Sequence, residues 1–596
     1  MSLLLSRRAL MALGAAAVLP LSQARAAPTP ATSPADAAFD ALGKDWLETS
    51  ARLSPIWATA MGDHRYDAQV DDLSPAGWAA KAAASAALLA RLEAIETSAL
   101  SRDRQVDAAL LRNSLAGDVW SAQTLQAHAW DPLIHNEMAG GALYSLIARD
   151  FAPITARLAS ATARMEAYPA LLAGTRATLV PARTPKIHAQ TVAGQNAGLV
   201  SLVDLLLAEA DALSGPERAR LQAAAATAKA AIAEHQAWID GTLVPQAAGE
   251  WRLGADLYDA KLRFALNSSL SRAEIKAAAE QALADIRSEM YGLSREVLAG
   301  RPEAPALPEA PTDEERQAAI AAAMEFVYAD RATPETLVEV CEAKLAAAIE
   351  FVATHPIVTP PTEPVELVLT PEFQRGVAVA YCDPPGPLDR GLPTFYKISP
   401  IPEDWTAEQA DSFLREYNNW TLEGLTTHEA TPGHYLQLAH SNRYPSILRS
   451  VLWSGPFVEG WACYAQDVMV EAGHRDGHPL YRLANLKFLL RVVANALLDI
   501  GVHVEGWDEA RAMRLMTHDA FQQEREAAGK WTRARVSSAQ LPTYFVGWRE
   551  HWALRREAQT KAGAAFDMKA YHDQVLGYGS PPVRFTRQLM FDLPIA

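Results

Sequence analysis

Four residues in the second half of the chain have the types and spacing of a metal site. His428 and Glu429 are adjacent, His434 lies six residues after His428, and Glu459 lies 25 residues after His434. Two imidazoles and one carboxylate are a ligand set that holds catalytic zinc and leaves one coordination position open. A carboxylate beside a ligand is placed to move protons to and from a metal-activated water. The pattern therefore predicts one Zn²⁺ ion held by His428, His434 and Glu459, with Glu429 as general base.

The spacing of the two histidines requires a break in the helix. Residues four apart on an α-helix differ by about 40° in azimuth and can share a metal, whereas residues six apart differ by about 240° and point away from each other. Pro432 and Gly433 stand between the histidines, and both residue types interrupt helices. We predict a bulge or break that returns His434 to the face of His428. A new helix capped by Thr431 and starting at Pro432 is the alternative.

The helix expected to carry Glu459 holds a second acid. Asp467 lies eight residues later, about 80° round the same helix. From there it could orient a histidine ligand by accepting its second N–H group. The alternative is that Asp467 is a solvent-exposed carboxylate on the helix surface with no role in the site.

The elements around these residues are predicted mainly from helical periodicity. Apolar residues recur three and four apart through the N-terminal helical region, 27–300, and through most of the catalytic region, 313–596. The Pro-rich segment 301–312 between them reads as a surface loop, and we expect one intertwined fold. Around the site, single helices are predicted over Gln409–Thr426, His434–Asn442, Val458–Ala472, Leu480–Ile500, Trp507–Ala528 and Leu541–Lys561.

Three short strands are predicted just before the metal segment, at Val365–Thr370, Gly376–Tyr381 and Thr394–Ser399. The expected fold class is thus mainly α, with a large helical fold, a central cleft and a small β-sheet next to the metal-binding helix. The strand with Tyr396 and Lys397 is a candidate edge strand that pairs with an extended substrate. Arg533, Arg549 and Lys397 are candidate partners for a substrate carboxylate, although each is individually more typical of a surface charge.

The first 26 residues predict an export signal. Arg7 and Arg8 precede the apolar run 9–21, which is too short to span a membrane and is followed by a small-x-small cleavage pattern at 24–26. Paired arginines favour the twin-arginine route to the periplasm, with an ordinary secretory signal as the alternative. No cysteine follows the predicted cleavage site, so no lipid anchor is expected. Beyond this segment no apolar stretch of 18 uncharged residues predicts a membrane span.

Composition narrows the function classes. Of 596 residues, 49% are hydrophobic, which is typical of a globular protein, and the formal charge of −16 argues against a nucleic-acid partner. The 3 cysteines exclude a disulfide framework. Nucleophile-elbow, phosphate-loop and dinucleotide motifs are absent from the sequence. Nothing in the sequence determines the oligomeric state.

Two segments carry a family resemblance. HEATPGHYLQ, residues 428–437, and VEGWACYAQD, residues 458–467, resemble the H-E-x-x-P-G-H and E-G-W-A-x-Y-A motifs of a large bacterial family labelled only as a domain of unknown function. The similarity covers most of the chain and includes Gly254–Tyr258, Leu498–His503 and residues 572–582. The family usually has a Pro-Gly pair before Gln540, where this chain has Ser538 and Ala539.

That family in turn resembles helical gluzincin peptidases, such as angiotensin-converting enzyme and the Taq-type carboxypeptidases. The resemblance implies the same two-His, one-Glu zinc site and glutamate base. It also implies a tyrosine and a histidine over the substrate carbonyl, and Tyr544 and His503 are the positions that match. Asp499, one turn before His503, is a candidate to hold that imidazole or to cap a surface.

Together these observations predict an exported zinc-dependent hydrolase of short peptides, acting as a carboxypeptidase, dipeptidase or oligopeptidase. Two alternatives stay open. One is a metal-dependent amide hydrolase of a non-peptide metabolite, and the other is a non-catalytic peptide-binding protein.

Overall fold

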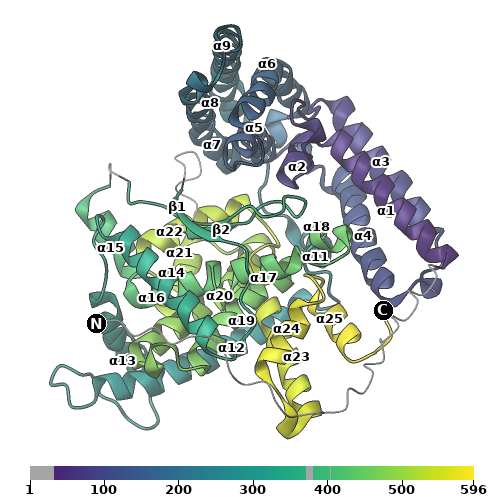
Figure 1. Cartoon of the computed structure of the whole chain (residues 1–596). Helices are drawn as coiled ribbons and strands as arrows, with labels where there is room; N and C mark the ends of the chain where they lie inside the picture. The colour runs from purple at the N-terminus through teal and green to yellow at the C-terminus, as the bar shows by residue number, and fades with distance from the viewer. Residues whose placement is uncertain (1–32, 371–379, 403–404, 596) are drawn as a thin grey trace, which may run out of the picture.

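The computed structural model describes residues 33–370, 380–402 and 405–595, and it is mainly helical, as the periodicity predicts (Figure 1). Several helices begin at capping boxes, in which a Ser or Thr side chain and a Glu or Gln three residues later satisfy two free backbone N–H groups. Such boxes start the helices after Ser214, Ser271, Thr312 and Thr406. The predicted signal peptide, residues 1–26, lies outside the described residues.

The N-terminal helices form two groups. Helices α1, α3 and α4 pack around a core that includes Phe39, Leu92 and Leu111, and helices α5, α6, α8 and α9 pack around Tyr168 and Leu202. The two groups lie along one side of the molecule (Figure 1). Their bounds are α1 (Pro34–Leu53), α2 (Pro55–Ala60), α3 (Pro75–Glu93), α4 (Arg102–Trp120), α5 (Pro132–Ile147), α6 (Ile154–Thr178), α7 (Lys186–Gln195), α8 (Gly198–Ala208), α9 (Gly215–Trp238) and α10 (Val244–Gln246).

One stretch within the described residues, Lys186–Ala212, is long and apolar enough to cross a membrane by length and composition alone. It comprises the two helices α7 and α8. The apolar face of α8, with Leu199, Leu202 and Leu206, is buried in the core that it shares with α6 and α9. Core packing therefore accounts for that face of α8, while Leu205 of the same helix is exposed.

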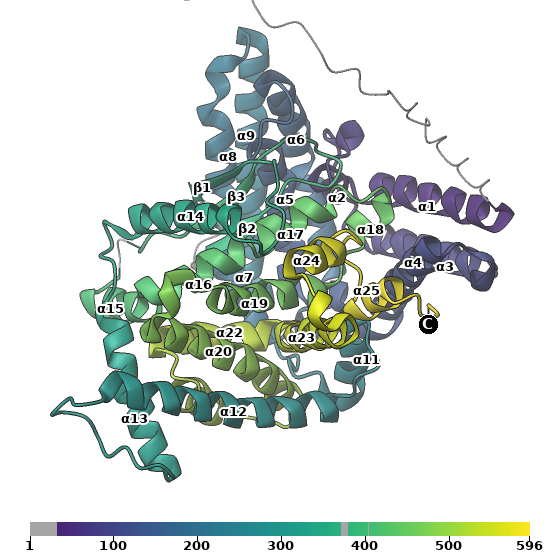
Figure 2. The ribbon, with the colours of Figure 1, turned by 60° about the horizontal axis from the view of Figure 1, so that its bottom comes forward.

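The last helices before residue 300 belong structurally with the C-terminal region, 313–596. Helix α11 (Gly254–Leu266) and helix α12 (Arg272–Leu298) share one core cluster with α20 (Pro479–His503), and α12 runs along α20 (Figure 2). Residues 301–312 connect α12 to α13 (Asp313–Ala329) without a helix or strand, as their prolines predict. The two predicted regions thus have a continuous core.

The small sheet has three strands in the order β1-β3-β2, namely β1 (Val365–Leu369), β2 (Ala380–Asp383) and β3 (Thr394–Ile398). Strand β3 is parallel to β1 and antiparallel to β2. The prediction that β3 is an edge strand is therefore wrong, because both of its edges are paired. Strand β2 lies at the edge that contacts α16. The predicted strand 376–381 falls mostly outside the described residues.

The remaining helices surround the sheet and α20. They are α14 (Leu337–Thr354), α15 (Ala407–Glu416), α16 (Asn419–Glu429), α17 (His434–Ser441), α18 (Ile447–Val451), α19 (Gly455–Glu471), α21 (Glu509–Met513), α22 (Glu524–Val536), α23 (Pro542–Ala562), α24 (Met568–Leu576) and α25 (Val583–Met590).

Two predicted single helices are each divided. The predicted helix over 409–426 breaks before Asn418, whose side chain accepts hydrogen bonds from the N–H groups of Trp420 and Thr421 and so caps α16. The predicted helix over 507–528 breaks after a π-helical turn, where Phe521 has a φ of 55°. Both breaks affect the site, because they set the orientation of α16, which carries His428 and Glu429, and of α22, which carries Arg533.

Candidate metal centre

The two histidines lie on either side of a break between helices. Helix α16 ends at Glu429, one residue after His428, and α17 begins at His434 with Gly433 at its N-cap. The four residues between the helices leave the helical path, and their chain includes a cis Thr431–Pro432 bond. The imidazole rings lie 4.7 Å apart between centroids. The predicted break is therefore present and returns His434 to His428, whereas the alternative helix start at Pro432 is not what forms.

Gly433 makes this turn sterically possible. Its backbone N–H donates to the Thr427 carbonyl at 3.0 Å. A Cβ atom built on Gly433 would lie 2.1 Å from the His428 carbonyl oxygen and 2.3 Å from that of Thr427. Because no side chain fits at that distance, the break depends on glycine at this position.

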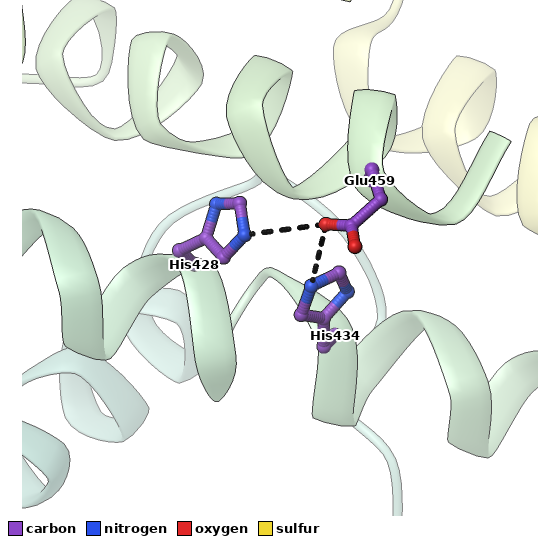
Figure 3. A group of neighbouring side chains, drawn as sticks. All are labelled: His428, His434 and Glu459. Carbon is purple, nitrogen blue, oxygen red and sulfur yellow. Dashed lines mark ion pairs between the residues drawn. The ribbon is translucent and has the colours of Figure 1, made fainter. Parts of the chain in front are cut away.

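Glu459 completes the cluster from the first turns of α19. Its Oε2 atom lies 3.7 Å from Nε2 of His428 and 3.3 Å from Nε2 of His434 (Figure 3). One candidate ligand atom from each of the three residues can be chosen so that all lie within 4.8 Å of one another. The three predicted ligands, from three separate helices, thus point at a common centre.

The donor atoms fit a zinc ion. Two ligand bonds of about 2.1 Å at a tetrahedral angle separate their donor atoms by about 3.4 Å, close to the measured separations. Oε2 of Glu459 is buried and has no hydrogen-bond partner among the described residues. Burial acts to raise the pKa of Glu459, but the two histidines more than offset it and hold that pKa well below its usual range. A buried carboxylate oxygen without a hydrogen-bond donor destabilises the fold, and a bound metal ion would remove that cost.

Gln466, which the sequence analysis did not identify, orients one ligand. Its Oε1 atom lies 3.1 Å from Nδ1 of His428, so Nδ1–H donates to it and Nε2 keeps a lone pair directed at Glu459. The role expected of Asp467 is therefore taken by its neighbour. Asp467 instead accepts hydrogen bonds from Trp548, Trp552 and Asn485 at 2.7 to 2.9 Å.

Trp461 is a second residue that the sequence analysis left without a role. It lies two residues after Glu459, and its indole N–H donates to the carbonyl of Pro432 at 2.8 Å. The ligand helix α19 therefore holds the turn between the histidines directly. The signal that could have identified Trp461 is its place in the E-G-W-A motif, where a buried indole needs an acceptor.

Glu429 lies beneath the cluster, against the sheet. Its Oε2 atom accepts the backbone N–H of Cys382 in β2 at 2.9 Å. Burial raises the pKa of Glu429 to about 7. The charge of His428 acts to lower this pKa, and the charge of Glu459 acts to raise it. A carboxyl group with a pKa near neutrality is suited to both accepting and returning a proton.

Tyr544 is held close to Glu459 by a contact between two helix backbones. A Cβ atom on Gly460 would lie 2.2 Å from the backbone of Gly547, so α19 and α23 cross with no side chain between them. Glu459 and Tyr544 stand one residue and three residues before that crossing. Burial raises the pKa of Tyr544, and the Glu459 carboxylate raises it further. Tyr544 is therefore a neutral hydroxyl beside the cluster, as expected.

Arg533 approaches from α22. Its Nη2 atom donates to Oε1 of Gln540 at 2.8 Å and to the hydroxyl of Tyr544 at 3.4 Å. Burial acts to lower the pKa of this guanidinium, but Tyr544 and the Glu459 carboxylate more than offset it and raise that pKa. The structure therefore brings Arg533 close to the His428, His434 and Glu459 cluster, whereas Arg549 is exposed and stacks on Phe545.

His503 does not reach the substrate side of the cluster, and its predicted role is wrong. Phe488 of α20 packs on His428 at 5.4 Å between ring centroids, and His503 is 15 residues further on, about 22 Å along the same helix. The buried Nε2 of His503 contacts the carbonyls of Ala534 and Ser537 at 2.9 and 2.7 Å. Its ring stabilises the end of α22.

Asp499 supports the turn that precedes Tyr544. Its Oδ2 atom accepts from the Tyr258 hydroxyl at 2.7 Å and from the N–H of Ala539 at 2.8 Å. Ala539 has a φ of 62°, in the left-handed region that favours glycine. This is the position where the family resemblance predicts glycine and this chain has alanine. Asp499 thus orders a backbone turn, and it does not hold His503 through a hydrogen bond.

The side chains of β3 serve the interior rather than a substrate. Tyr396 is fully buried, and its hydroxyl lies 3.1 Å from that of Thr426, so its proposed contact with substrate is wrong. Lys397 is also buried and pairs with Asp383 of β2 at 2.6 Å. Arg149 of α5 pairs with the same carboxylate at 3.0 Å. The residue after Cys382 is therefore tied to the N-terminal helices.

The fold and the site define a class: a large, mainly helical protein with a buried two-His, one-Glu cluster and a glutamate beside one ligand. The chain belongs to a family described as bacterial proteins of unknown function (DUF885), whose model matches residues 55–590. The resemblance to a bacterial family of unknown function is thereby confirmed. The further resemblance to metallopeptidases stays a prediction.

Two solved structures match nearly the whole chain. A "putative lipoprotein" of unknown function from Shewanella oneidensis is 33% identical with a TM-score of 0.77, and the match covers 93% of this chain and 99% of that one. A "putative lipoprotein" from Colwellia psychrerythraea is 17% identical with a TM-score of 0.75 and the same coverage, so it bears on the fold alone. No curated protein matches the chain.

Proposed function

We propose that this protein is an exported zinc-dependent hydrolase that cleaves amide bonds in short peptides. The observation that carries the proposal is the convergence of His428, His434 and Glu459 on one centre, with an unpartnered buried carboxylate oxygen at that centre. Glu429 beside His428 adds the proton acceptor that hydrolysis requires.

Bound zinc supplies Lewis acidity at the scissile carbonyl and lowers the pKa of a water. The chain's own residues supply the rest of the chemistry. Glu429 takes the proton from the attacking water and returns it to the leaving amine. One of its oxygens is fixed by the Cys382 N–H, so we assign the other, Oε1, to this transfer. The neutral hydroxyl of Tyr544, directed by Arg533, donates to the developing oxyanion.

Strand β2 takes the place in this proposal that the sequence analysis gave to β3. Among the described residues β2 pairs only with β3, and the N–H of Cys382 points away from β3 toward Glu429. An extended peptide beside β2 would run past the candidate metal centre, although the N–H of Cys382 is already donated to Glu429. This supports peptides as substrates ahead of compact metabolites.

Export is part of the same proposal. The paired arginines of residues 1–26 predict the twin-arginine route, and both structural relatives are described as lipoproteins, a class of exported proteins. We propose a periplasmic location. Replacing Arg7 and Arg8 with lysine should leave the protein in the cytoplasm on cell fractionation; unchanged export would refute the twin-arginine route.

Metal content measured by plasma mass spectrometry is the first test. Wild-type protein is expected to hold close to one zinc per chain, and His434→Ala and Glu459→Ala are expected to lose it. Glu429→Gln should keep the metal and lose hydrolysis of a short-peptide library. A wild type that binds no zinc under saturating conditions would refute the proposal and favour a peptide-binding role, whereas hydrolysis confined to non-peptide amides would favour the metabolite hydrolase.

A further inference from the structure

A group of charged residues between α20 and α22 is unbalanced. Lys487 and Arg491 of α20 and Lys530 and Arg533 of α22 contribute four cations, and the only carboxylates paired with them among the described residues are Glu416 and Glu526. Since the chain as a whole has 70 acids and 54 lysines and arginines, a buried surplus of positive charge runs against the composition.

The two carboxylates are already occupied by the cations of α20. Glu416 pairs with Lys487 at 2.7 Å. Glu526 pairs closely with Arg491 and also accepts the hydroxyl of Tyr417 at 2.9 Å. These contacts form a closed structural network around the N-terminal part of α22.

Lys530 and Arg533 are left without a hydrogen-bonded carboxylate in the described part of the chain. Lys530 is 5% exposed, and its nearest acid is Glu526 at 3.6 Å, which Arg491 holds more closely. Burial, and then the charge of Arg491, lower the pKa of Lys530 to about 7. Arg533 donates only to neutral oxygens, those of Gln540 and Tyr544. Lys530 therefore shares its paired acid with Arg491, and the half-buried Arg533 has no paired acid among the described residues. Positive charge that is only partly compensated inside a protein is destabilising, and a bound anion would balance it.

Arg533 lies toward the candidate metal centre, and Lys530 stands close to it on the same helix. They are three residues apart on α22 and therefore share a face. Arg533 contacts Tyr544, which the Gly460–Gly547 crossing holds near Glu459. On the opposite side, Arg491 follows by one helical turn the Phe488 that packs on His428. The surplus charge thus borders the position of the scissile bond.

We infer that Lys530 and Arg533 bind the free carboxylate of the substrate, so that the protein acts on peptides or acylated amino acids with a carboxylate close to the scissile amide. This inference rests on the proposed hydrolase function and narrows it to release of C-terminal residues. A substrate carboxylate would give Lys530 a counter-ion that it does not share with Arg491, and it would accept from the N–H groups of Arg533 that do not donate to Gln540 or Tyr544.

The test compares peptide acids with their amides. Zinc-loaded Glu429→Gln protein, immobilised, is offered a pool of benzoyl-glycyl dipeptide acids mixed with the same sequences as C-terminal amides, and retained species are counted by mass spectrometry. Acids should be retained about tenfold to hundredfold better than amides, the effect of one to two charged hydrogen bonds. Adding Lys530→Met or Arg533→Gln should remove most of that preference. Arg549→Gln, which removes an exposed charge from α23, is the matched control and should keep it.

Equal retention of acids and amides, or no retention of either, would overturn the inference. The inference can fail while the proposed function holds, because a wild-type protein that hydrolyses peptide acids and peptide amides equally well is still a zinc hydrolase. A merely structural role of Arg533, through Tyr544, predicts equal loss of turnover on both substrates and no change in the acid-to-amide ratio. That result would also overturn it. Thermal unfolding of each variant checks that the fold is intact.

Discussion

The substitution Gly433→Ala tests whether the turn between the histidines creates the metal centre. An alanine Cβ would lie 2.1 Å from the His428 carbonyl oxygen, whereas Cβ contacts below 3.0 Å essentially do not occur. Relief of the clash therefore needs a displacement of roughly 1 Å between the segments that carry the two histidines. Metal sites tolerate ligand displacements of about 0.2 Å. We expect zinc affinity to fall by more than about 100-fold, beyond the loss that follows removal of an outer partner.

Zinc affinity is measured by competition with a chromophoric chelator on protein stripped of metal, after circular dichroism has shown that the variant is folded. Gly455→Ala is the matched control. It lies in the first turn of α19, four residues before Glu459, and its Cβ would be 3.6 Å from Thr543, an ordinary contact. This control should bind zinc as the wild type does.

A folded Gly433→Ala protein with zinc affinity within threefold of wild type would refute the reasoning, since the close approach would then not set the ligand geometry. If the variant does not fold, Trp461→Phe tests the same turn. It removes the hydrogen bond to the Pro432 carbonyl and keeps most of the aromatic volume. We expect zinc affinity to fall about tenfold in that variant.

Three further predictions follow from the site. Gln466→Leu removes the acceptor for Nδ1 of His428, and zinc affinity should fall about 10-fold to 100-fold in the same competition assay; an unchanged affinity would remove Gln466 from the site. Ala539→Gly relaxes a residue at φ 62°, and the free energy of unfolding in urea should rise by about 0.5 to 1 kcal/mol, with no gain contradicting the strain. Lys530 has a pKa lowered to about 7, so between pH 7 and its unfolded value near 10.5 the unfolded chain holds a proton that the folded chain has released. Stability should therefore rise with pH across that window relative to Lys530→Met, and parallel pH profiles would refute the burial of an uncompensated lysine beside Arg491.

The convergence of His428, His434 and Glu459 could be predicted from the sequence because the relevant information is local. The helix repeat shows that His428 and His434 cannot share a face of one regular helix. The Pro-Gly pair between them indicates where the helix must break. Glu459 could be predicted as the third ligand because the 25 residues after His434 are enough for one helix, a turn and a second helix that returns to the histidines. The small sheet was also located correctly, from β-branched and aromatic residues among prolines.

What the sequence did not determine depends on contacts between distant segments. The order of strands, which places β3 in the middle, is set by pairing rather than by composition. The choice between Gln466 and Asp467 depends on a rotation of one residue on α19, about 100°, which no pattern in the sequence fixes. His503 matched a family expectation, but the length of α20 carries it away from the cluster. The surplus of positive charge around Lys530 depends on which acids pair with Lys487 and Arg491, and the sequence does not determine those pairs.

The link between Arg149, Asp383 and the backbone of Cys382 has a mechanical consequence. Arg149 belongs to α5 in the N-terminal helices, Asp383 is its partner in β2, and the adjacent Cys382 N–H fixes one oxygen of Glu429. These contacts lie in series, so a rotation of the N-terminal helices would displace the Glu429 carboxylate, to which we assign the proton transfer. The N-terminal helices and the Glu429 carboxylate are thereby connected through a single short strand, and cutting that connection would release Glu429 from its anchor while leaving the three candidate metal ligands in place.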